Sequence, residues 1–452
     1  MAQCNEDMNQ TRALAEQYDV IIVGGRPAGA SLATRLGARG IDVLVIDRAD
    51  FPSAPAVPSC PLIYPSTMHL LDDMGVEEAV YARSALPVRE IAIEFGSHFT
   101  VPITMIDVLG RDYVYSLDRA QFDRALWDNL ARYPSVTRRA RFSFVDLVRD
   151  ETGRVIGIEG HDEGAETVRI GARCVVGADG RFSMVARKAG ARVTEDYPDC
   201  TSTVYFAEWE GVRDLPGSGD PGVLLHATGR GLNVMFFPLP GGHTTVCTHA
   251  RADRVDVHGH ADVYYRETLA GLPSVRRRLE GAKQVTPLLG LKRIANRYYD
   301  FGGPGWMLVG DAVHQKDPVD GQGIYDALLE TKILSEVLAA WLTGTTSFDT
   351  ALSRYRERVL AETHPMFLAT MTRLQRELYD EPPEAVIRTM VRWLLNDPEY
   401  QRRFLQFLSR AIPPSSWLPP SLMPAAALRG ALGDFKRWFR GERAPARPRV
   451  AA

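Results

Sequence analysis

A stretch near the N-terminus, Tyr18 to Arg48, constrains the fold of this chain more than any other. It begins with an apolar run rich in β-branched residues, Val20 to Val23, which predicts a buried strand. Glycines follow at once and predict a turn into a helix, whose free N–H groups and dipole favour a pyrophosphate. A second apolar run, Ile41 to Ile46, ends in Asp47, about 20 residues past the glycines and placed to bind a ribose. The stretch therefore predicts a βαβ dinucleotide-binding unit.

The residues expected to contact the dinucleotide lie in the turn and directly after the second strand. They are Gly24, Gly25, Arg26, Ala28, Gly29, Asp47 and Arg48. Arg26 takes the place of the middle glycine of G-x-G-x-x-G, where a missing side chain normally lets the diphosphate approach. We expect its guanidinium to neutralise phosphate charge directly. The alternative is a βαβ unit that binds no nucleotide.

Composition excludes several classes of protein. With 452 residues, 45% of them hydrophobic, the chain is long enough for a large core and two or three structural parts. A net charge of -3 and the lack of a nucleic-acid-binding motif argue against a nucleic-acid binder. Five cysteines without C-x-x-C spacing predict neither a disulfide framework nor a metal site. We expect a protein of the reducing cytoplasm.

The two ends of the chain carry weaker signals. Residues 1–17 are polar and are expected to be disordered, with no secretory signal pattern. No apolar run approaches the length that spans a bilayer. The stretch Arg429 to Val450 has seven basic against two acidic residues, and a solvated end is favoured over contact with a membrane or a partner.

Between these ends, periodicity predicts an order of elements. The proline-rich segment Phe51 to Ser66 predicts a loop that covers a ligand, and Thr67 to Val80 has helical spacing. Residues 86–116 and 201–250 alternate as strands, the latter enough for a sheet of about four. Asp118 is a predicted N-cap of a helix that returns to the nucleotide domain. From residue 348 onward helical patterns dominate.

Two further motifs follow buried strands. The sequence GADGR, Gly177 to Arg181, follows one strand, and GDAVH, Gly310 to His314, follows another. The second motif continues through Pro318 to GQGI and a long amphipathic helix beginning near Gly321, so a second helix N-terminus faces a ligand. Asp311 is an acidic group placed for a sugar or ribityl hydroxyl.

With these motifs in this order, residues 18–345 resemble the class A flavoprotein monooxygenases, the para-hydroxybenzoate hydroxylase-like group. The resemblance implies an α/β fold with an FAD-binding Rossmann-like domain of the glutathione reductase type, an inserted mixed or antiparallel β-sheet substrate domain and a helical C-terminal region. The expected FAD domain is discontinuous and covers residues 18–85, 110–195 and 286–345. The substrate domain then covers residues 86–109 and 196–285, and the helical region residues 346–452.

The resemblance also implies roles for individual residues. Gly24, Gly29 and Asp47 would hold the ADP half of non-covalent FAD, and Arg119 would approach its phosphate or ribityl region. Asp179, in the family's Asp-Gly motif, would help to position FAD and is associated with NAD(P)H use. Around the flavin ring the implied residues are Asp311 at the ribityl chain, Pro318 at the oxygen-reacting face, and Gly321, Gly323 and Ile324 at the pyrimidine.

Two positions near the flavin differ from the family pattern. The usual glycine before GQG is Asp320, and the usual asparagine is Tyr325. A carboxylate about 5 Å from the anionic reduced flavin would oppose it by roughly 3 kcal/mol at an effective dielectric of 20, so Asp320 should point away from the pyrimidine. It is expected either to cap the helix starting at Gly321 or to act as a base toward a phenol-like hydroxyl.

The reaction implied by the resemblance is oxygen insertion into an electron-rich organic substrate, aromatic or polyketide-like. NAD(P)H would reduce FAD without a partner reductase, and O₂ would react to a C4a-hydroperoxide that transfers one oxygen atom, without a metal. The substrate is expected to lie against the second sheet. Candidate lining residues are Tyr205, His226, Met235, Phe236 and Phe237. His243 and His314 are interpreted as structural.

Three alternatives share the cofactor. A flavin-dependent halogenase is disfavoured because its W-x-W-x-I-P signature is replaced by MFFPLP, Met235 to Pro240. A reductase of the geranylgeranyl reductase type would act without consuming oxygen. A non-enzymatic flavin-binding protein would bind FAD without being reduced by NAD(P)H.

Overall fold

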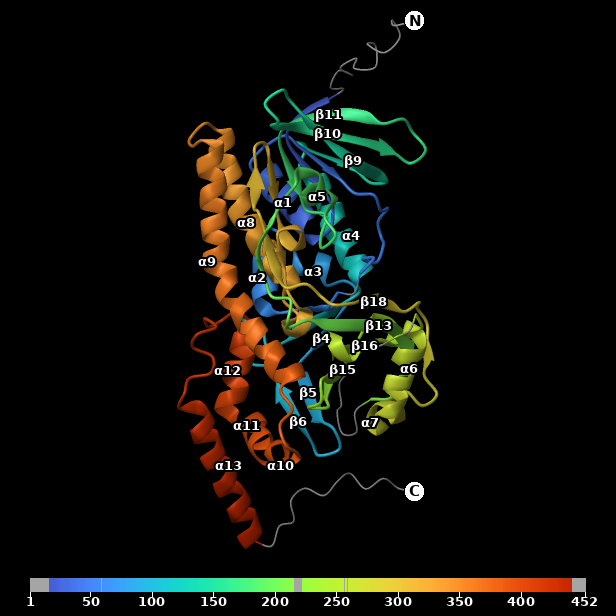
Figure 1. The fold of residues 1–452 in the computed structure, drawn as a ribbon, viewed down its shortest axis with the longest axis vertical. Helices are drawn as coiled ribbons and strands as arrows, with labels where there is room; N and C mark the ends of the chain where they lie inside the picture. Colours follow the sequence, from blue (N-terminus) through green and yellow to red (C-terminus); the bar gives the residue numbers. More distant parts are fainter. Residues whose placement is uncertain (1–15, 58, 215–221, 256, 258, 441–452) are drawn as a thin grey trace, which may run out of the picture.

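The computed structural model describes residues 16–57, 59–214, 222–255, 257 and 259–440. The expectation of disorder in residues 1–17 therefore falls almost wholly outside the described residues. Two large sheets lie one above the other in Figure 1, and the long helix α9 (Phe348–Leu374) runs beside the upper one toward the lower one. The fold predicted from the motifs is confirmed: an FAD-type α/β domain, a second sheet and a helical C-terminal region.

The first sheet is built on the predicted βαβ unit. Its parallel strands are β8 (Val136–Arg139), β2 (Val43–Ile46), β1 (Glu16–Val23), β11 (Val168–Gly177) and β21 (Trp306–Leu308), with β20 (Gly302–Gly303) antiparallel at the edge. Helices α1 (Pro27–Gly37) and α8 (Gly323–Leu342) pack against each other beside it. Strands β2 and β21 and residues 20–23 of β1 are buried, because their apolar runs face neighbours on both sides of the sheet.

The strand β11 joins two parts of this sheet. Its first half pairs antiparallel with β10 (Val155–Asp162), which pairs with β9 (Phe142–Arg149). From Glu16 onward β1 pairs in parallel with residues 170–177 of β11. The antiparallel strands β9 and β10 are therefore an extension of the nucleotide domain's own sheet.

The second sheet is mainly antiparallel. Its strand order is β17 (Lys283–Gln284), β13 (Ser202–Glu210), β16 (His243–Arg251), β15 (Leu232–Pro238), β14 (Val223–Ala227), β5 (Glu90–Phe95) and β6 (Phe99–Thr104). The four strands predicted within residues 201–250 are all present. Strand β18 (Leu289–Leu291) also pairs with β13, so this sheet continues slightly beyond residue 285.

Helices and two small sheets complete the fold. Helices α6 (Ala261–Gly271) and α7 (Pro273–Arg278) supply Tyr265, Leu269 and Val275 to a core on one face of the second sheet. The small sheets are β3 (Leu62–Ile63), β7 (Val114–Leu117) and β4 (Ala85–Val88), and β12 (Val193–Asp196), β19 (Arg297–Tyr299) and β22 (His314–Gln315).

The N-terminal helices differ in part from the expected pattern. The single helix expected over residues 67–80 is two helices, α2 (Pro65–Asp72) and α3 (Glu78–Tyr81), because the chain turns at Gly75 with a φ of 67°. The predicted N-cap Asp118 is confirmed, since its carboxylate accepts from Ala120 and Gln121 N–H at the start of α4 (Arg119–Asn129).

The C-terminal region consists of helices, as its periodicity predicted. After α9 come α10 (Glu384–Val386), α11 (Arg392–Leu395), α12 (Pro398–Leu408) and α13 (Leu422–Phe439). Figure 1 shows α11, α12 and α13 gathered at the end of the molecule that holds the second sheet. Among the described residues, no helix combines the length and the apolar character needed to cross a bilayer.

Candidate active site

The glycine turn after β1 lies against the turn after β21. A Cβ at Gly24, whose φ is 106°, would lie 2.5 Å from the Ala178 carbonyl oxygen, and one at Gly29 would lie 1.7 Å from that of Gly24. Gly310 also lies close to this turn, because a Cβ there would come within 3.2 Å of the Ala28 Cβ. Two motifs separated by nearly 300 residues therefore meet at the first turn of α1.

Two carboxylates flank this meeting point. Asp47, directly after β2, accepts hydrogen bonds from the N–H groups of Gly25 and Ala49, both at 2.8 Å. Asp311 has a 40% exposed carboxylate that lies 3.3 Å from the Arg181 guanidinium. Glu330 of α8 accepts from the Gly310 N–H at 2.6 Å and so holds the turn that presents Asp311. A glycine cradle with one carboxylate on each side fits the two ends of a dinucleotide such as FAD.

Arg26 is not turned toward a phosphate site. Its guanidinium lies 2.7 Å from the buried carboxylate of Asp123 and donates to the carbonyl oxygen and hydroxyl of Ser53. Arg119 pairs with the same Asp123 at 3.0 Å and donates to Ser59. This corrects the expectation that Arg26 neutralises phosphate charge, since a fully buried carboxylate requires a cationic partner. Arg48 is exposed.

Asp179 is tied to the helix that follows it. Its carboxylate accepts from the Ser183 hydroxyl at 2.5 Å and from the N–H groups of Met184 and Val185 at 2.7 and 3.1 Å. These bonds hold the first turn of α5 (Met184–Ala189). Burial raises the pKa of Asp179 against the opposing effect of the Ser183 hydrogen bond. The structure thus gives Asp179 a role in shaping the turn after β11.

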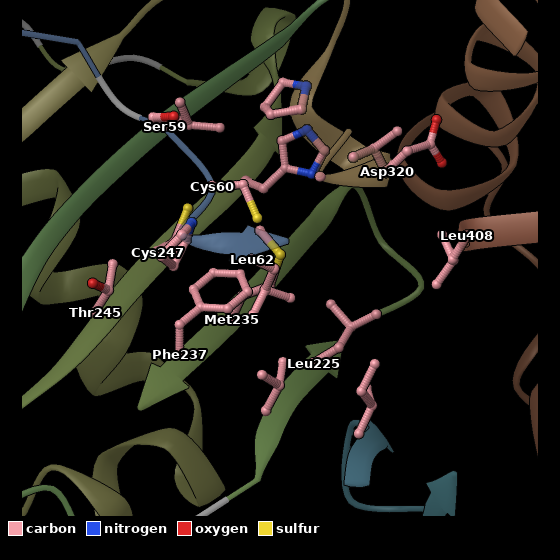
Figure 2. Close-up of a pocket in the computed structure, with 18 of the residues that line it drawn as sticks. Ser59, Cys60, Leu62, Leu225, Met235, Phe237, Thr245, Cys247, Asp320 and Leu408 are labelled. Carbon is pink, nitrogen blue, oxygen red and sulfur yellow. The ribbon is translucent and has the colours of Figure 1, made fainter. Parts of the chain in front are cut away.

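An apolar cavity lies between the second sheet, the segment after Phe51, the turn Pro318–Gly321 and the C-terminal helices (Figure 2). The sheet contributes alternate residues of five strands, and these are Ile91, Ile93, Val204, Phe206, Val223, Leu225, Met235, Phe237, Thr245, Cys247 and His249. The remaining walls are Ser59, Cys60, Pro61, Leu62, Tyr64, Pro318, Val319, Asp320, Gly321, Arg373, Phe404 and Leu408.

Only some of the predicted lining residues face this cavity. Met235 and Phe237 lie on its wall, whereas Phe236 between them points to the opposite face of the sheet. Tyr205 also lies on that opposite face, 5.9 Å from the ring of Tyr264 between ring centroids. His226 is buried there too, with Nδ1 2.8 Å from a carboxylate oxygen of Glu94. The strands were predicted correctly, but the sequence pattern did not reveal which of the two alternating sets of side chains faces the cavity.

A buried polar group at the cavity wall was missed by the sequence analysis. His249 Nε2 lies 3.1 Å from Asp317 Oδ1, and the exposed fractions of the two side chains are 1% and 0%. Asp317 also accepts from the Ser202 hydroxyl and the Val319 N–H. Burial alone would raise the pKa of Asp317, but the charge and hydrogen bonds of His249 and Ser202 lower it overall. Thr245, Cys247 and His249 are alternate residues of β16, so their side chains point to the same face of the sheet. This alternation was the feature of the sequence that could have identified His249.

Asp320 neither caps a helix nor stands free as a base. Helix α8 begins at Gly323 with Gln322 as its N-cap, so the expected start near Gly321 was two residues early. The buried carboxylate of Asp320 accepts from Arg373 at 2.7 Å and from the hydroxyl of Thr370, both on α9. The sequence analysis missed this partner because α9 carries no recognisable motif.

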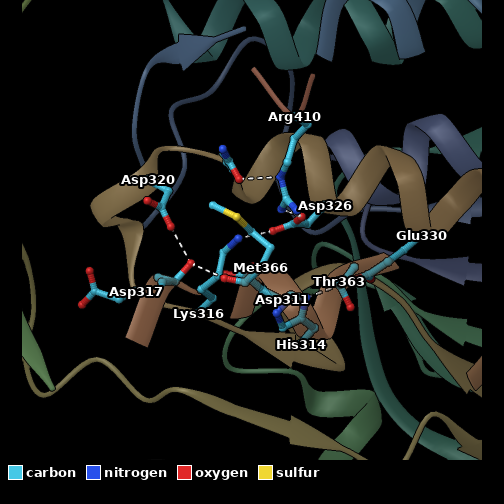
Figure 3. Close-up of polar contacts among 12 residues, drawn as sticks. Asp311, His314, Lys316, Asp317, Asp320, Asp326, Glu330, Thr363, Met366 and Arg410 are labelled. Atoms are coloured by element: carbon cyan, nitrogen blue, oxygen red, sulfur yellow. Dashed lines mark hydrogen bonds and ion pairs between the residues drawn. The ribbon is translucent and has the colours of Figure 1, made fainter. Parts of the chain in front are cut away.

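A second charged cluster lies at the N-terminal end of α8 (Figure 3). Asp326 pairs with Lys316 at 2.6 Å and with Arg410, which follows α12. Burial alone would raise the pKa of Asp326, but the two cations lower it to about 2. Arg410 also donates to the Gln322 side chain at 2.6 Å, and Gln322 donates to the Leu408 carbonyl oxygen at 2.8 Å. Residues 408–410 of the C-terminal region are therefore attached by hydrogen bonds and an ion pair to the start of α8, where the motifs predict the flavin to bind.

Two further residues expected near the flavin, Gly323 and Ile324, lie at the same helix start. Gly323 is exposed with open space where a Cβ would stand, and Ile324 is buried beside it. His314 stacks on Tyr298 with centroids 4.4 Å apart, and its Nδ1 lies 3.2 Å from Glu330. That packing agrees with the interpretation of His314 as structural.

Comparison with known proteins identifies the family. The model of a family described as FAD binding domain matches residues 17–366. The chain belongs to this family, the class A FAD-dependent monooxygenases. The predicted cofactor and enzyme class are confirmed: the protein is an FAD-dependent oxidoreductase of the hydroxylase type.

Relatives within the family differ in what they act on. Ubiquinone hydroxylase UbiL of Rhodospirillum rubrum is 29% identical over 353 residues, 71% of this chain and 72% of that protein. A digeranylgeranylglycerophospholipid reductase of Methanocella arvoryzae is 26% identical over 351 residues, 76% of this chain and 83% of the reductase. The solved flavin-dependent brominase Bmp2 has a TM-score of 0.71 and 17% identity, covering 93% of this chain and 100% of the brominase, which shows a shared fold.

Proposed function

We propose that this FAD-dependent enzyme inserts one oxygen atom from O₂ into an apolar aromatic or polyketide-like substrate, using NAD(P)H. The observation that carries the proposal is the cavity between the second sheet and the turn Pro318–Gly321, where the motifs place the flavin. Its walls are mostly apolar and carry a few polar side chains, which suits a largely hydrophobic molecule with a polar group. When bound, FAD supplies the transfer of reducing equivalents and the activation of oxygen.

The residues of the chain supply binding, water exclusion and one proton site. Met235, Phe237 and Phe404 exclude water from the cavity. Because the Asp317 carboxylate faces Nε2 of His249, it favours the tautomer with the proton on Nε2 and leaves Nδ1 as the acceptor. We assign His249 Nδ1 to a phenolic hydroxyl of the substrate, whose deprotonation makes the ring more electron-rich.

This assignment replaces Asp320 with His249 as the candidate base. The Asp320 carboxylate is occupied by Arg373 and Thr370. Pro318 keeps its proposed place at the oxygen-reacting side, since it lines the cavity at the turn before α8. The ubiquinone named for the relative UbiL is one example of a molecule that joins a ring to a long apolar chain.

The purified protein tests the proposal directly. We expect it to be yellow, to be bleached by NADH or NADPH without a partner reductase, and to consume O₂ while a phenol or naphthol gains one oxygen atom, measured by oxygen electrode and mass spectrometry. Isotope from ¹⁸O₂ in the product would identify the source of that atom. Flavin bleaching and substrate reduction without oxygen consumption would contradict the proposal and favour a prenyl-chain reductase.

His249 is tested by one substitution with a matched control. His249→Gln should lower turnover of a phenolic substrate about 100-fold and remove the acidic limb of its pH profile, while flavin reduction by NAD(P)H persists. His243→Gln changes the other end of β16, where the histidine is 42% exposed, and should leave turnover unaltered. An unchanged pH profile in the His249 variant would refute the assignment.

A further inference from the structure

The last described helix, α13, is fixed to the protein along one side only. Leu422 and Ala426 are buried, and Gly430 lies so close to Trp393 that a Cβ would come within 2.2 Å of its ring. The carboxylate of Asp434 accepts from the indole N–H of Trp393 at 2.8 Å and pairs with Arg392. These contacts attach α13 to α11.

The opposite side of α13 carries an exposed apolar stripe, whose members are Leu428, Leu432, Phe435, Trp438 and Phe439. Their exposed fractions are between 49% and 79%, the highest at the aromatic end. Spacings of four, three and four from Leu428 to Phe439 put four of them on one helix face, with Trp438 beside it. Figure 1 shows this end of α13 at the lower edge of the molecule, away from both sheets. A contiguous apolar patch of this kind marks an interaction surface.

Basic side chains flank the stripe. Arg429, Lys436 and Arg440 each directly follow a stripe residue in sequence, so they lie about 100° around the helix from it. The acidic residue on this part of the helix, Asp434, is already paired with Arg392. An aromatic and leucine face beside lysine and arginine is the composition of helices that lie in a membrane interface.

We propose that this face of α13 docks on an anionic lipid surface. The aromatic end inserts among the headgroups, and Lys436 on the basic flank pairs with lipid phosphates, whereas Arg429 stays paired with Asp397. A second copy of this chain fits less well, because a two-fold contact through the stripe would bring two basic flanks together. Charge complementarity thus selects the lipid surface as the occupant.

The docked helix is connected to the cavity. Arg429 of α13 pairs with Asp397 at 2.7 Å, and Asp397 caps α12. That helix supplies Phe404 and Leu408 to the cavity wall. If the proposed function holds, docking therefore places a hydrophobic substrate dissolved in the bilayer near the helix that closes its binding site.

Vesicle cosedimentation of the full FAD-loaded chain tests the docking. We expect the flavin colour to pellet with vesicles of equal phosphatidylcholine and phosphatidylglycerol, far less with phosphatidylcholine alone, and less as salt is raised. The variant Phe435→Ser with Trp438→Ser and Phe439→Ser should weaken binding about tenfold or more. Val263→Ser removes an exposed apolar side chain from α6 and serves as the control that keeps full binding.

A second variant separates charge from insertion. Lys436→Gln with Arg440→Gln should abolish the preference for anionic vesicles and its salt dependence. The proposal would be overturned if the variant with serine at positions 435, 438 and 439, the stripe variant, bound vesicles as well as the wild-type protein does. It would also be overturned if the wild-type protein bound no vesicles. A wild-type dimer that ignores vesicles and becomes monomeric in the stripe variant would overturn it too, because the face would then bind a second copy. Flavin reduction by NAD(P)H is measured alongside and reports on the proposed function independently of docking.

Discussion

Asp320→Asn distinguishes a structural carboxylate from a catalytic one. The carboxylate of Asp320 is wholly buried, lies 2.7 Å from Arg373 Nη1 and accepts from the Thr370 hydroxyl. Burial alone would lower the pKa of Arg373, but Glu377 and Asp320 raise it overall, so the guanidinium stays charged. An amide has nearly the same shape and keeps one acceptor, yet it removes the negative charge that Arg373 faces.

The size of the effect follows from this geometry. Removing one partner of a buried ion pair destabilises by about 3–5 kcal/mol, and the retained acceptor of Asn with the second carboxylate of Glu377 puts the expected loss near the lower value, about 3 kcal/mol. With an unfolding entropy of about 2.1 cal/mol/K per residue, that corresponds to a fall in Tm of about 3 °C for a chain of this length. Glu377→Gln is the matched control. Its carboxylate is 26% exposed, so the loss should be about 1 kcal/mol or less.

The assay compares thermal unfolding, followed by tryptophan fluorescence at saturating FAD, with the pH profile of turnover. We expect Asp320→Asn to lower Tm more than Glu377→Gln does and to leave the pH dependence of product formation unchanged. A variant with wild-type Tm whose turnover falls about 100-fold or more, with one limb of the pH profile lost, would refute this reasoning. Asp320 would then be a base, despite its contacts with Arg373 and Thr370.

Three further changes probe the cofactor site, the charged cluster and the cavity. Asp311→Ala should weaken FAD retention about tenfold or more, measured from the flavin-to-protein absorbance ratio after gel filtration. Asp326 has a pKa of about 2, below its value in the unfolded chain, so the stability that its charge provides is complete above about pH 4 and is lost toward pH 2. Asp326→Asn should therefore remove this acid dependence and lower the free energy of unfolding at pH 7 by about 2 kcal/mol, measured by urea unfolding. Met235→Trp should fill the cavity and cut turnover about tenfold with FAD retained, whereas Tyr205→Phe on the opposite face should leave turnover within about twofold.

The nucleotide domain was predictable because its constraints are local. Gly24 and Gly29 allow contacts that a Cβ would block, and the strands beside them are buried on both faces, so both leave a mark in the sequence. The turn at Gly310 was also recognisable, since GDAVH follows an apolar strand. The contact between Gly310 and Ala28 could be found only from the structure, because neither segment's sequence indicates how far it lies from the other in space.

Side-chain partners were predicted less well for the same reason. Arg26 was assigned to a phosphate because its place in the glycine motif is near one, yet its charge is used by Asp123, a residue 97 positions away. Asp320 was assigned to a cap or a base from its neighbours in sequence, whereas its partner Arg373 lies 53 positions further on. Electrostatic pairing depends on distance in space, and a buried carboxylate binds whichever cation the packing brings to it.

The C-terminal helical region forms part of the cavity wall, although no sequence motif marks it. Arg373 of α9 and Phe404 and Leu408 of α12 close the cavity, and Arg410 holds the first turn of α8 through Gln322 and Asp326. Apolar walls can be built from many different side chains, so such a region keeps its function without a fixed signature. The motifs therefore mark the FAD-binding domain, whereas the shape of the cavity is set by the second sheet and these helices together. Two relatives of similar identity, one named as a ubiquinone hydroxylase and one as a digeranylgeranylglycerophospholipid reductase, are consistent with that division, because a shared fold can serve different substrates.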